Sequence, residues 1–452
     1  MKLQTIAAFF IAACAASVSL SAQNPIIRDN FSADPSAHVF EGRVYVYPSH
    51  DIPAPADYAR KDWFCMADYH VYSSDNLVDW VDHGVIVDQW SVPWVNSAGY
   101  SMWAPDCNYH NGKYYFYFPA PQKPREGVRG GNGIGVAISD TPYGPFIPEE
   151  QPIQGIGGID PCIFIDDDGT PYLAWSGRGL QVARLKDNML ELDSEPVTIS
   201  GIPRGMTEGP FLFKRNGKYY YTFPWVEDAR ETLAYCMADN PLGPYEFKGK
   251  FMEQSETICW TNHHSFIELD GQWYLFYHHN DYSPYFDKNR SVCIDYLYFN
   301  PDGTIQMVTP TLRGVGTTKA TSLIQIDRYS NKSEQYVAVD FLNSEYTFDG
   351  WKAILWNTTQ ETEPRWISYD RVDFGQNKLN TATIRVHSLA GGKIELRADA
   401  LDGPVLASFN VPGEAVWAER TVQVSESVRG VHNLYLLMTD GNHVEVDWVN
   451  FK

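Results

Sequence analysis

Basic residues are scarce in this chain. Its 452 residues include 35 Lys and Arg against 56 Asp and Glu, which gives a formal net charge of −21 at pH 7. Proteins that bind nucleic acid neutralise its phosphates with clustered Lys and Arg, so this composition excludes nucleic acid as a partner. The same negative charge repels acidic polymers such as unesterified pectate. Neutral partners are therefore favoured, and nothing in the sequence implies a protein partner.

Long apolar runs are also scarce. One run, from Ile6 to Ala16, follows Met1-Lys2 and leads into small residues that end at Ala22, which is the pattern of a secretory signal peptide over residues 1–22. No other stretch reaches the length of a membrane span. We therefore expect an exported protein, periplasmic or extracellular, without a membrane span.

Cysteine is infrequent and shows no motif. Of the seven Cys, Cys14 leaves with the signal peptide, and the other six are scattered, several of them within strand-like apolar runs. This distribution predicts buried free thiols rather than a disulfide framework or a metal cluster.

Segments with helical periodicity are absent, whereas aromatic-rich hairpins recur. In one of them, the apolar run Phe211-Leu-Phe is followed by the turn Arg215-Asn-Gly-Lys218 and by a second strand, Tyr219-Tyr-Tyr. Similar turns with a central glycine occur five times, 48 to 70 residues apart, at Gly42, Gly112, Gly169, Gly217 and Gly271. Spacings of this size match four-stranded blades. The sequence predicts an all-β protein whose first domain, residues 23–320, is a five-bladed β-propeller.

Three acidic residues occupy matched positions in these repeats. Asp34 lies eight residues before the first turn glycine, and Asp160 and Glu208 each lie nine before theirs. Because the first strand of each blade lines the axis of a propeller, residues at one position on three blades should face a common cavity. The difference of one residue could turn a side chain to the other face of its strand, although the length of the turn can absorb it.

Other residues fall at or near the same cavity. Trp103 lies nine residues before the second turn glycine, and His263 eight before the fifth. An indole ring offers an apolar platform with a polar tip, which suits a sugar ring. Arg290 enters the last strands of the propeller, where it could donate to a sugar hydroxyl or a carboxylate.

The rhythm of hairpins ends after Asn300-Pro-Asp-Gly-Thr-Ile305. A connector rich in Thr and Gly, Thr309 to Thr321, is followed by short alternating strands such as Thr383-Ile-Arg-Val-His and Lys393-Ile-Glu-Leu-Arg. These features predict a β-sandwich of the jelly-roll type over residues 321–452.

Three carboxyl groups in one channel suit hydrolysis of a glycosidic bond. The reaction needs a protonated acid at the leaving oxygen and a carboxylate that either activates water or attacks carbon. A wide channel with acids on separate blades favours the larger separation that inversion requires. A third carboxylate near the acid would raise its pKa by repulsion.

The motifs Ala33-Asp34-Pro35, Trp103-Ala-Pro-Asp106, Gly158-Ile-Asp160-Pro161 and Thr207-Glu208-Gly-Pro210 resemble glycoside hydrolase family 43 over residues 24 to 320. The resemblance implies an inverting five-bladed enzyme with Asp34 as general base and Glu208 as general acid. It implies that Asp160 tunes and orients Glu208. Arg290 resembles the substrate-contacting arginine of the family, and His263 the axial histidine that helps some members hold a structural calcium ion. The chemistry itself requires no cofactor.

The C-terminal segment resembles carbohydrate-binding module family 6 through Val372-Asp-Phe374, Gly392 to Asp399 and Val446 to Phe451. Many such modules stack a sugar on two aromatic residues in a Gly-Gly-Trp-x-x-Trp pattern. Here Gly413-Glu-Ala-Val-Trp417 keeps only the second. We therefore expect this module to act mainly as a structural partner of the propeller.

These features together predict an inverting hydrolase that acts on arabinan, arabinoxylan or xylan of plant cell walls. The expected activity is that of an exo-acting α-L-arabinofuranosidase, with a β-1,4-xylosidase or an endo-acting xylanase or arabinanase of the same family as alternatives. The long segment from Ile52 to Asp68 favours exo action, because it could wall off one side of the channel. A non-catalytic sugar-binding propeller and a retaining, invertase-type enzyme remain open as other classes.

Overall fold

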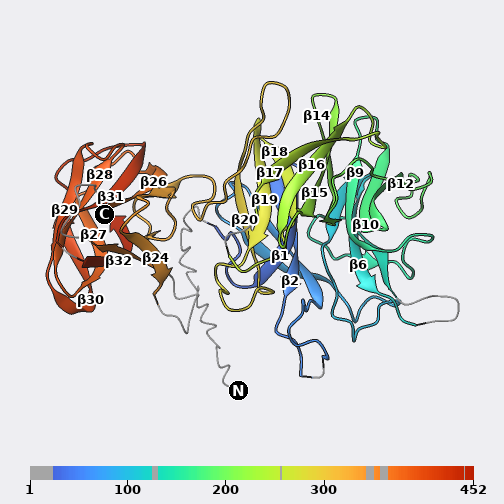
Figure 1. The fold of residues 1–452 in the computed structure, drawn as a ribbon, viewed down its shortest axis with the longest axis horizontal. Helices are drawn as coiled ribbons and strands as arrows, with labels where there is room; N and C mark the ends of the chain where they lie inside the picture. Colours follow the sequence, from blue (N-terminus) through green and yellow to red (C-terminus); the bar gives the residue numbers. More distant parts are fainter. Residues whose placement is uncertain are drawn as a thin grey trace, which may run out of the picture.

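The computed structural model describes residues 24–56, 58–124, 131–254, 257–342, 351–356, 365–441 and 443–452. The predicted signal peptide lies outside these ranges. No helix occurs in the described parts of the chain, so none there could cross a membrane. The strands form two bodies, a large one from the N-terminal two thirds of the chain and a smaller one from the C-terminal third (Figure 1).

The large body is a five-bladed propeller, as predicted. The first blade contains β1 (Phe31–Phe40), β2 (Arg43–Asp51), β3 (Asp68–Ser74) and β4 (Val81–Asp88). The second contains β5 (Asp106–His110), β6 (Lys113–Pro121), β7 (Asn132–Ser139) and β8 (Ile147–Pro148). The third contains β9 (Ile159–Ile165), β10 (Pro171–Gly177), β11 (Gly179–Arg184) and β12 (Val197–Thr198).

The fourth blade contains β13 (Met206–Thr207), β14 (Phe211–Arg215), β15 (Lys218–Val226), β16 (Glu231–Ala238) and β17 (Glu246–Met252). The fifth contains β18 (His264–Leu269), β19 (Gln272–His279) and β20 (Ser291–Leu297). Each blade is an antiparallel sheet in which consecutive strands pair, except that β13 and β14 of the fourth blade both pair with β15.

Tight turns explain why the hairpins recur. Asn216 and Gly217 join β14 to β15 with φ angles of 50° and 75°. Two consecutive positive φ angles define the type I′ turn, whose twist matches that of the flanking strands. Asn tolerates this conformation and Gly adopts it without strain.

The inner strands close the ring. β1, β5, β9, β14 and β18 contact one another in that order, and β18 contacts β1 again. The N-terminal segment strengthens this closure, because Ile26 N donates to Val292 O of β20 at 2.8 Å and Asn24 exchanges hydrogen bonds with the backbone of Ile294. The first and last blades are thereby joined.

Aromatic side chains fill the space between blades. The largest fully buried ones include Trp175, Tyr47, Tyr117, Phe116 and Phe223. Much of the high aromatic content therefore serves packing. The six cysteines after residue 23 are free and buried, as predicted.

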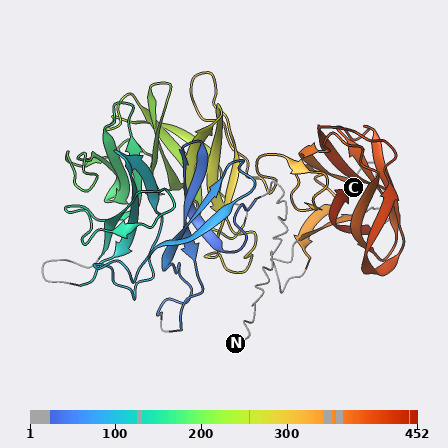
Figure 2. The same cartoon turned by 180° about the vertical axis from the view of Figure 1, so that it is seen from behind.

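The small body is a β-sandwich (Figures 1 and 2). One sheet has the order β21 (Thr318–Lys319), β26 (Arg365–Asp373), β31 (Val431–Gly441), β28 (Gly392–Ala398), β29 (Val405–Val411), with β23 (Asn331–Lys332) paired to β26. The other has the order β24 (Val337–Phe341), β25 (Trp351–Trp356), β32 (His443–Phe451), β27 (Thr381–Ser388), β30 (Glu414–Gln423), with β22 (Ile324–Gln325) paired to β32. A core of aliphatic residues with Tyr369, Phe374, Phe409 and Phe451 lies between them.

The junction between the bodies is made of specific contacts. Thr318 and Lys319 pair in parallel with β26, so the sandwich sheet begins slightly before the boundary at residue 320. Arg313 Nη2 donates to Asp370 O at 2.9 Å. The Tyr282 hydroxyl, in the loop after β19, accepts hydrogen bonds from Arg28 Nη2 at 2.8 Å and from Arg328 of the sandwich.

Candidate active site

Asp34 and Asp160 lie at matching irregularities in the first strands of two blades. Their φ angles are 50° and 55°. The register of β1 against β2 shifts between Ala33 and Ser36, and that of β9 against β10 shifts around Asp160. Bulges of this kind re-aim a side chain and are frequent next to active sites. The left-handed backbone at both Asp-Pro pairs turns the carboxylates towards the axis.

Glu208 lies in the gap between β13 and β14 of the fourth blade. Gly209, which follows it, has a φ of 52°, and a Cβ atom there would lie 2.7 Å from Cδ2 of His263. Glycine is therefore required for this close approach. Gly209 N donates to Asp160 Oδ2 at 3.0 Å, which ties the acid of the third blade to the loop that carries the acid of the fourth.

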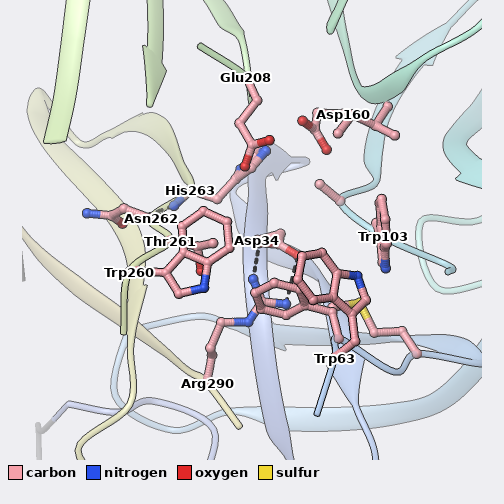
Figure 3. Close-up of a pocket in the computed structure, with 14 residues that line it drawn as sticks. Asp34, Trp63, Trp103, Asp160, Glu208, Trp260, Thr261, Asn262, His263 and Arg290 are labelled. Atoms are coloured by element: carbon pink, nitrogen blue, oxygen red, sulfur yellow. Dashed lines mark hydrogen bonds and ion pairs between the residues drawn. The ribbon is translucent and has the colours of Figure 1, made fainter. Parts of the chain in front are cut away.

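All six site residues predicted from the sequence line one pocket (Figure 3). The pocket has a volume of about 90 Å³. Its lining comprises Asp34, Trp63, Phe64, Met66, Trp103, Ala104, Ile159, Asp160, Glu208, Trp260, Thr261, Asn262, His263 and Arg290.

Asp34 is held as a carboxylate. Arg290 Nη1 donates to its Oδ1 at 2.9 Å, and the Ser49 hydroxyl donates to its Oδ2 at 2.7 Å. Burial would raise the pKa of Asp34, but the Arg290 guanidinium, aided by His278 and other neighbours, lowers it to about 2. Asp34 is therefore ionised near neutral pH.

Arg290 is buried rather than part of a surface ion pair. Its Nε and Nη2 donate to the two oxygens of Asp51 at 3.0 and 2.9 Å. Burial alone would lower the pKa of Arg290, but Asp34 and Asp51 raise it. Asp51 does not line the pocket, and it was not among the residues predicted from the sequence. The sequence shows only that an acidic residue ends the second strand of the first blade.

Asp160 and Glu208 have raised pKa values. Burial is the main cause for both. The charge of Glu208 raises the pKa of Asp160 further. The charge of Asp34 likewise raises the pKa of Glu208. We expected a neighbouring carboxylate to raise the pKa of Glu208 by repulsion, and the carboxylate that does so is Asp34. The repulsion between Asp160 and Glu208 raises the pKa of Asp160 instead.

The aromatic wall of the pocket exceeds what the sequence indicated. Trp103 lines it as expected, and Trp63, Phe64 and Trp260 join it. Trp63 and Phe64 belong to the long segment from Ile52 to Asp68, so that segment does border the pocket. The Nε1 atoms of Trp63 and Trp103 are buried and have no hydrogen-bond partner in the described structure.

His263 is a poor calcium ligand in this arrangement. Its Nδ1 accepts the backbone N–H of His264 at 3.0 Å, which places the proton of the neutral ring on Nε2. Burial lowers the pKa of His263, so the ring stays neutral. Nε2 is buried with no partner among the described residues. This nitrogen carries a proton and has no free lone pair, whereas Ca²⁺ needs a lone-pair donor and prefers oxygen ligands.

One group of residues has the spacing of metal ligands among the residues that the structure describes. The ligand atoms of His50, Asp68 and His70 lie within 4.8 Å of one another. His50 Nδ1 is 2.7 Å from Asp68, and His70 Nδ1 is 3.1 Å from Asp82. Hydrogen bonds within the protein account for this group, and we assign no metal to it.

Family comparisons agree with the geometry of the pocket. The profile of glycosyl hydrolases family 43 matches residues 22–305, and that of carbohydrate binding module (family 6) matches residues 346–452. The chain is 35% identical over 336 residues to xylosidase/arabinosidase 43A of Humicola insolens, an alignment that covers 63% of this chain and 99% of that protein. It is 29% identical over 483 residues to an arabinoxylan arabinofuranohydrolase of Paenibacillus polymyxa, covering 94% of this chain and 73% of that protein.

Solved structures show the same fold. A β-xylosidase/α-arabinofuranosidase from a compost microbial metagenome, in complex with xylotriose and in a calcium-free form, aligns with a TM-score of 0.57 and 36% identity over 64% of this chain and 98% of that one. An arabinoxylan arabinofuranohydrolase from Bacillus subtilis aligns over 96% of this chain and 100% of that one, with a TM-score of 0.54 and 24% identity. The second match extends the likeness in fold to the sandwich.

Proposed function

The chain belongs to glycosyl hydrolase family 43, and from this premise we propose that it inverts configuration while releasing neutral pentose from plant cell-wall polysaccharide. One observation carries the proposal. An ionised carboxylate, Asp34, and a carboxyl group with a raised pKa, Glu208, line the same pocket from different blades. Two carboxyl groups whose environments separate their pKa values can divide the roles of base and acid.

Asp34 serves as the general base in this proposal. It takes a proton from a water molecule that attacks the anomeric carbon, and its low pKa keeps it ready to do so at any pH well above about 2. Arg290 orients it and borders the pocket, where it also contacts the substrate.

Glu208 serves as the general acid. It gives its proton to the glycosidic oxygen as the bond between carbon and oxygen breaks, and the leaving group keeps the electron pair. Asp160 holds the Gly209 N–H and so fixes the loop that carries Glu208. This chemistry uses carboxyl groups and water and needs no cofactor, and we assign no step to calcium.

The substrate is a neutral pentoside, with a terminal α-L-arabinofuranoside first and a β-1,4-xyloside second. The relatives named above act on xylosides, arabinosides or arabinoxylan, and the net charge of −21 disfavours acidic polymers. The rings of Trp63, Phe64, Trp103 and Trp260 line the pocket and offer apolar platforms that suit a sugar ring. Trp63 and Phe64, from the segment Ile52 to Asp68, border the pocket, which favours binding of one terminal sugar unit and thus exo action.

We also propose that the protein is exported after removal of residues 1–22, and that the sandwich is chiefly a structural partner of the propeller. Export places the enzyme where plant polysaccharide is encountered. Trp417, the single remaining aromatic of the sugar-stacking pattern, lies beneath the guanidinium of Arg385 at 5.0 Å and beside the ring of His387 at 5.5 Å.

Two variants test the proposed roles. Glu208→Gln and Asp34→Asn should each lower kcat by about 10² to 10⁴-fold on an alkyl arabinofuranoside while leaving the Tm nearly unchanged. A nitrophenyl glycoside needs little protonation, so it should rescue Glu208→Gln but not Asp34→Asn. Wild-type rates in Glu208→Gln on the alkyl glycoside would contradict the assignment of the acid.

Proton NMR of the first-formed sugar tests the stereochemistry. Inversion of an α-arabinofuranoside gives the β-anomer first. Appearance of the α-anomer first would indicate a retaining enzyme of the invertase type. Binding without any hydrolysis across a panel of aryl pentosides would indicate a sugar-binding propeller.

A further inference from the structure

A fourth carboxyl group lies behind the pocket, in a position that neither the sequence motifs nor the pocket lining reveals. Glu231 begins β16 of the fourth blade and is 2% exposed. Its backbone N–H donates to Trp260 O at 2.9 Å. Its Oε2 accepts the backbone N–H of Asn262 at 2.6 Å. Trp260 and Asn262 both line the pocket, so Glu231 is fixed against its wall.

The other oxygen of Glu231, Oε1, is buried, and no N–H or O–H group of the described residues donates to it. The carboxyl groups of Glu231 and Glu208 lie within hydrogen-bonding reach of each other, and each shifts the pKa of the other. Two carboxylates have only acceptors, so this contact requires a proton on one of them. Two buried carboxyl groups in contact cannot both ionise without a large cost.

We propose that Glu231 is a positioning residue for Glu208, which stays protonated and donates its carboxyl O–H to the Glu208 carboxyl group throughout the reaction. This inference rests on the proposed function, because it assigns Glu231 a role through the general acid. Glu231 would thus act on the general acid, Glu208, as Arg290 acts on the general base, Asp34.

The electrostatic environment agrees with this order of protonation. Burial and the charge of Glu208 raise the pKa of Glu231 well above its usual value. Burial also raises the pKa of Glu208, but the hydrogen bond from Glu231 lowers it. Glu231 therefore moderates a pKa that burial and the Asp34 charge would otherwise push higher, and it keeps Glu208 acidic enough to give up its proton.

The proton balance is simple. Before the reaction both Glu208 and Glu231 carry a proton. Glu208 transfers its proton to the glycosidic oxygen, and the leaving group departs as an alcohol. The Glu208 carboxylate that remains accepts the O–H of Glu231, whose own proton does not leave. After the product departs, water returns a proton to Glu208.

Two substitutions separate this role from simple packing. Glu231→Gln keeps a donor, because the side-chain amide can replace the carboxyl O–H, whereas Glu231→Leu keeps the approximate volume and removes the hydrogen bond. Glu227→Gln and Glu227→Leu are matched controls, because Glu227 lies nearby in the chain and its side chain is 52% exposed. The measurements are kcat/KM against pH on an alkyl and a nitrophenyl arabinofuranoside, together with the Tm of each variant.

Glu231→Leu should move the alkaline limb of kcat/KM to higher pH by about one unit, because the hydrogen bond that lowers the Glu208 pKa is gone. It should lower kcat about 10- to 100-fold on the alkyl glycoside and much less on the nitrophenyl glycoside. Glu231→Gln should keep its alkaline limb within a few tenths of a unit of wild type. An unmoved limb in Glu231→Leu, or equal losses on the two substrates, would overturn the proposal in favour of a packing role.

A second readout does not depend on activity. Infrared difference spectra of each variant against wild type at neutral pH should show that Glu231→Gln loses one protonated carboxyl C=O band, and that this band is still present in Glu208→Gln. If Glu231→Gln loses no such band, the proposal is overturned even if the enzyme is active. Failure of the proposed function is distinguishable, because then wild type itself would not hydrolyse the pentosides or Glu208→Gln would match it.

Discussion

Arg290 Nη1 donates to Asp34 Oδ1 at 2.9 Å across 256 positions of sequence, from the last blade to the first. The same guanidinium contacts both oxygens of Asp51 at the end of β2. Because this cluster is buried, its ionic hydrogen bonds are strong, and loss of the Arg290 guanidinium would leave two carboxylates without a compensating charge. The proposed base therefore owes its charge state to the closure of the ring.

Replacing Arg290 should shift the acid limb of the pH profile. In wild type the pKa of Asp34 is about 2, so kcat/KM should hold its value as pH falls to about 4. In Arg290→Met, burial is no longer opposed by the guanidinium, the pKa of Asp34 rises, and activity should be lost at pH values where wild type is still active. The measurement is kcat/KM on a nitrophenyl arabinofuranoside from pH 3 to 7.

The control for this experiment is Arg290→Met combined with Asp51→Asn, which removes the second carboxylate left without a partner. The double variant should recover part of the lost Tm and keep the raised acid limb. An acid limb at the wild-type pH in both variants would contradict the claim that Arg290 sets the charge state of Asp34.

Hairpins and matched acids could be predicted from the sequence because their signals are local. The residue types of the Asn216-Gly217 turn predict a hairpin. Asp34, Asp160 and Glu208 each lie eight or nine residues before the glycine of such a turn. Asp34 is one residue closer to its turn glycine than the other two acids, but its side chain still faces the pocket. Bulges at Asp34 and Asp160, and the break before β14, place all three on the pocket.

Asp51 and Glu231 could not be predicted, because their roles depend on partners far away in sequence. Asp51 contacts Arg290, and Glu231 accepts the Asn262 N–H from the next blade. Neither residue lies in a motif. The start of the sandwich at Thr318 could not be predicted either, because it is defined by pairing with β26, a strand more than 40 residues further along the chain.

Asp106 should be a stability residue, although it belongs to the Trp103-Ala-Pro-Asp106 motif. It is 1% exposed; it accepts hydrogen bonds from Ser36 of the first blade and Ile163 N of the third, and contacts His38 at 2.6 Å. Asp106→Asn presents a donor to groups that are themselves donors, and we expect a loss of about 2 to 4 kcal/mol in the free energy of unfolding. Thermal denaturation measures it.

The control for Asp106 is Asp75→Asn, whose side chain is 71% exposed and pairs with Arg43. Exposed pairs of this kind contribute about 0 to 1 kcal/mol, so its Tm should stay close to wild type. Equal Tm values for the two variants would show that Asp106 does not join the blades in the way its contacts indicate.

Trp63 should contribute to binding of the terminal sugar. Its ring borders the pocket, its Nε1 has no partner in the described structure, and Arg60 lies 3.8 Å from the ring centroid on a segment outside the blades. Trp63→Ala should raise KM for arabino-oligosaccharides about tenfold, a change of about 1.4 kcal/mol. Trp63→Phe, which keeps a ring but loses the N–H, should fall between.

Trp90→Ala is the matched control for Trp63, because Trp90 is 62% exposed and does not line the pocket. Product sizing on arabinan completes the test. Release of single pentose units from the first minutes supports an exo-acting pocket, whereas oligosaccharides of mixed length would show an endo-acting cleft.

The sandwich should stabilise the propeller through Tyr282. The hydroxyl of this residue accepts hydrogen bonds from Arg28 of the propeller and Arg328 of the sandwich, and the guanidinium groups of both lie within 5.9 Å of its ring. Tyr282→Phe keeps the ring and removes the shared acceptor. Hydrogen bonds to charged groups contribute about 1.5 to 3 kcal/mol each, so the Tm should fall by several degrees, and truncation after Gly316 should lower it further. Activity on arabinoxylan and on a nitrophenyl glycoside, measured below the Tm, should change by the same factor in both variants. A truncated propeller that keeps its Tm and loses only its activity on polymer would show instead that the sandwich works as a carbohydrate anchor.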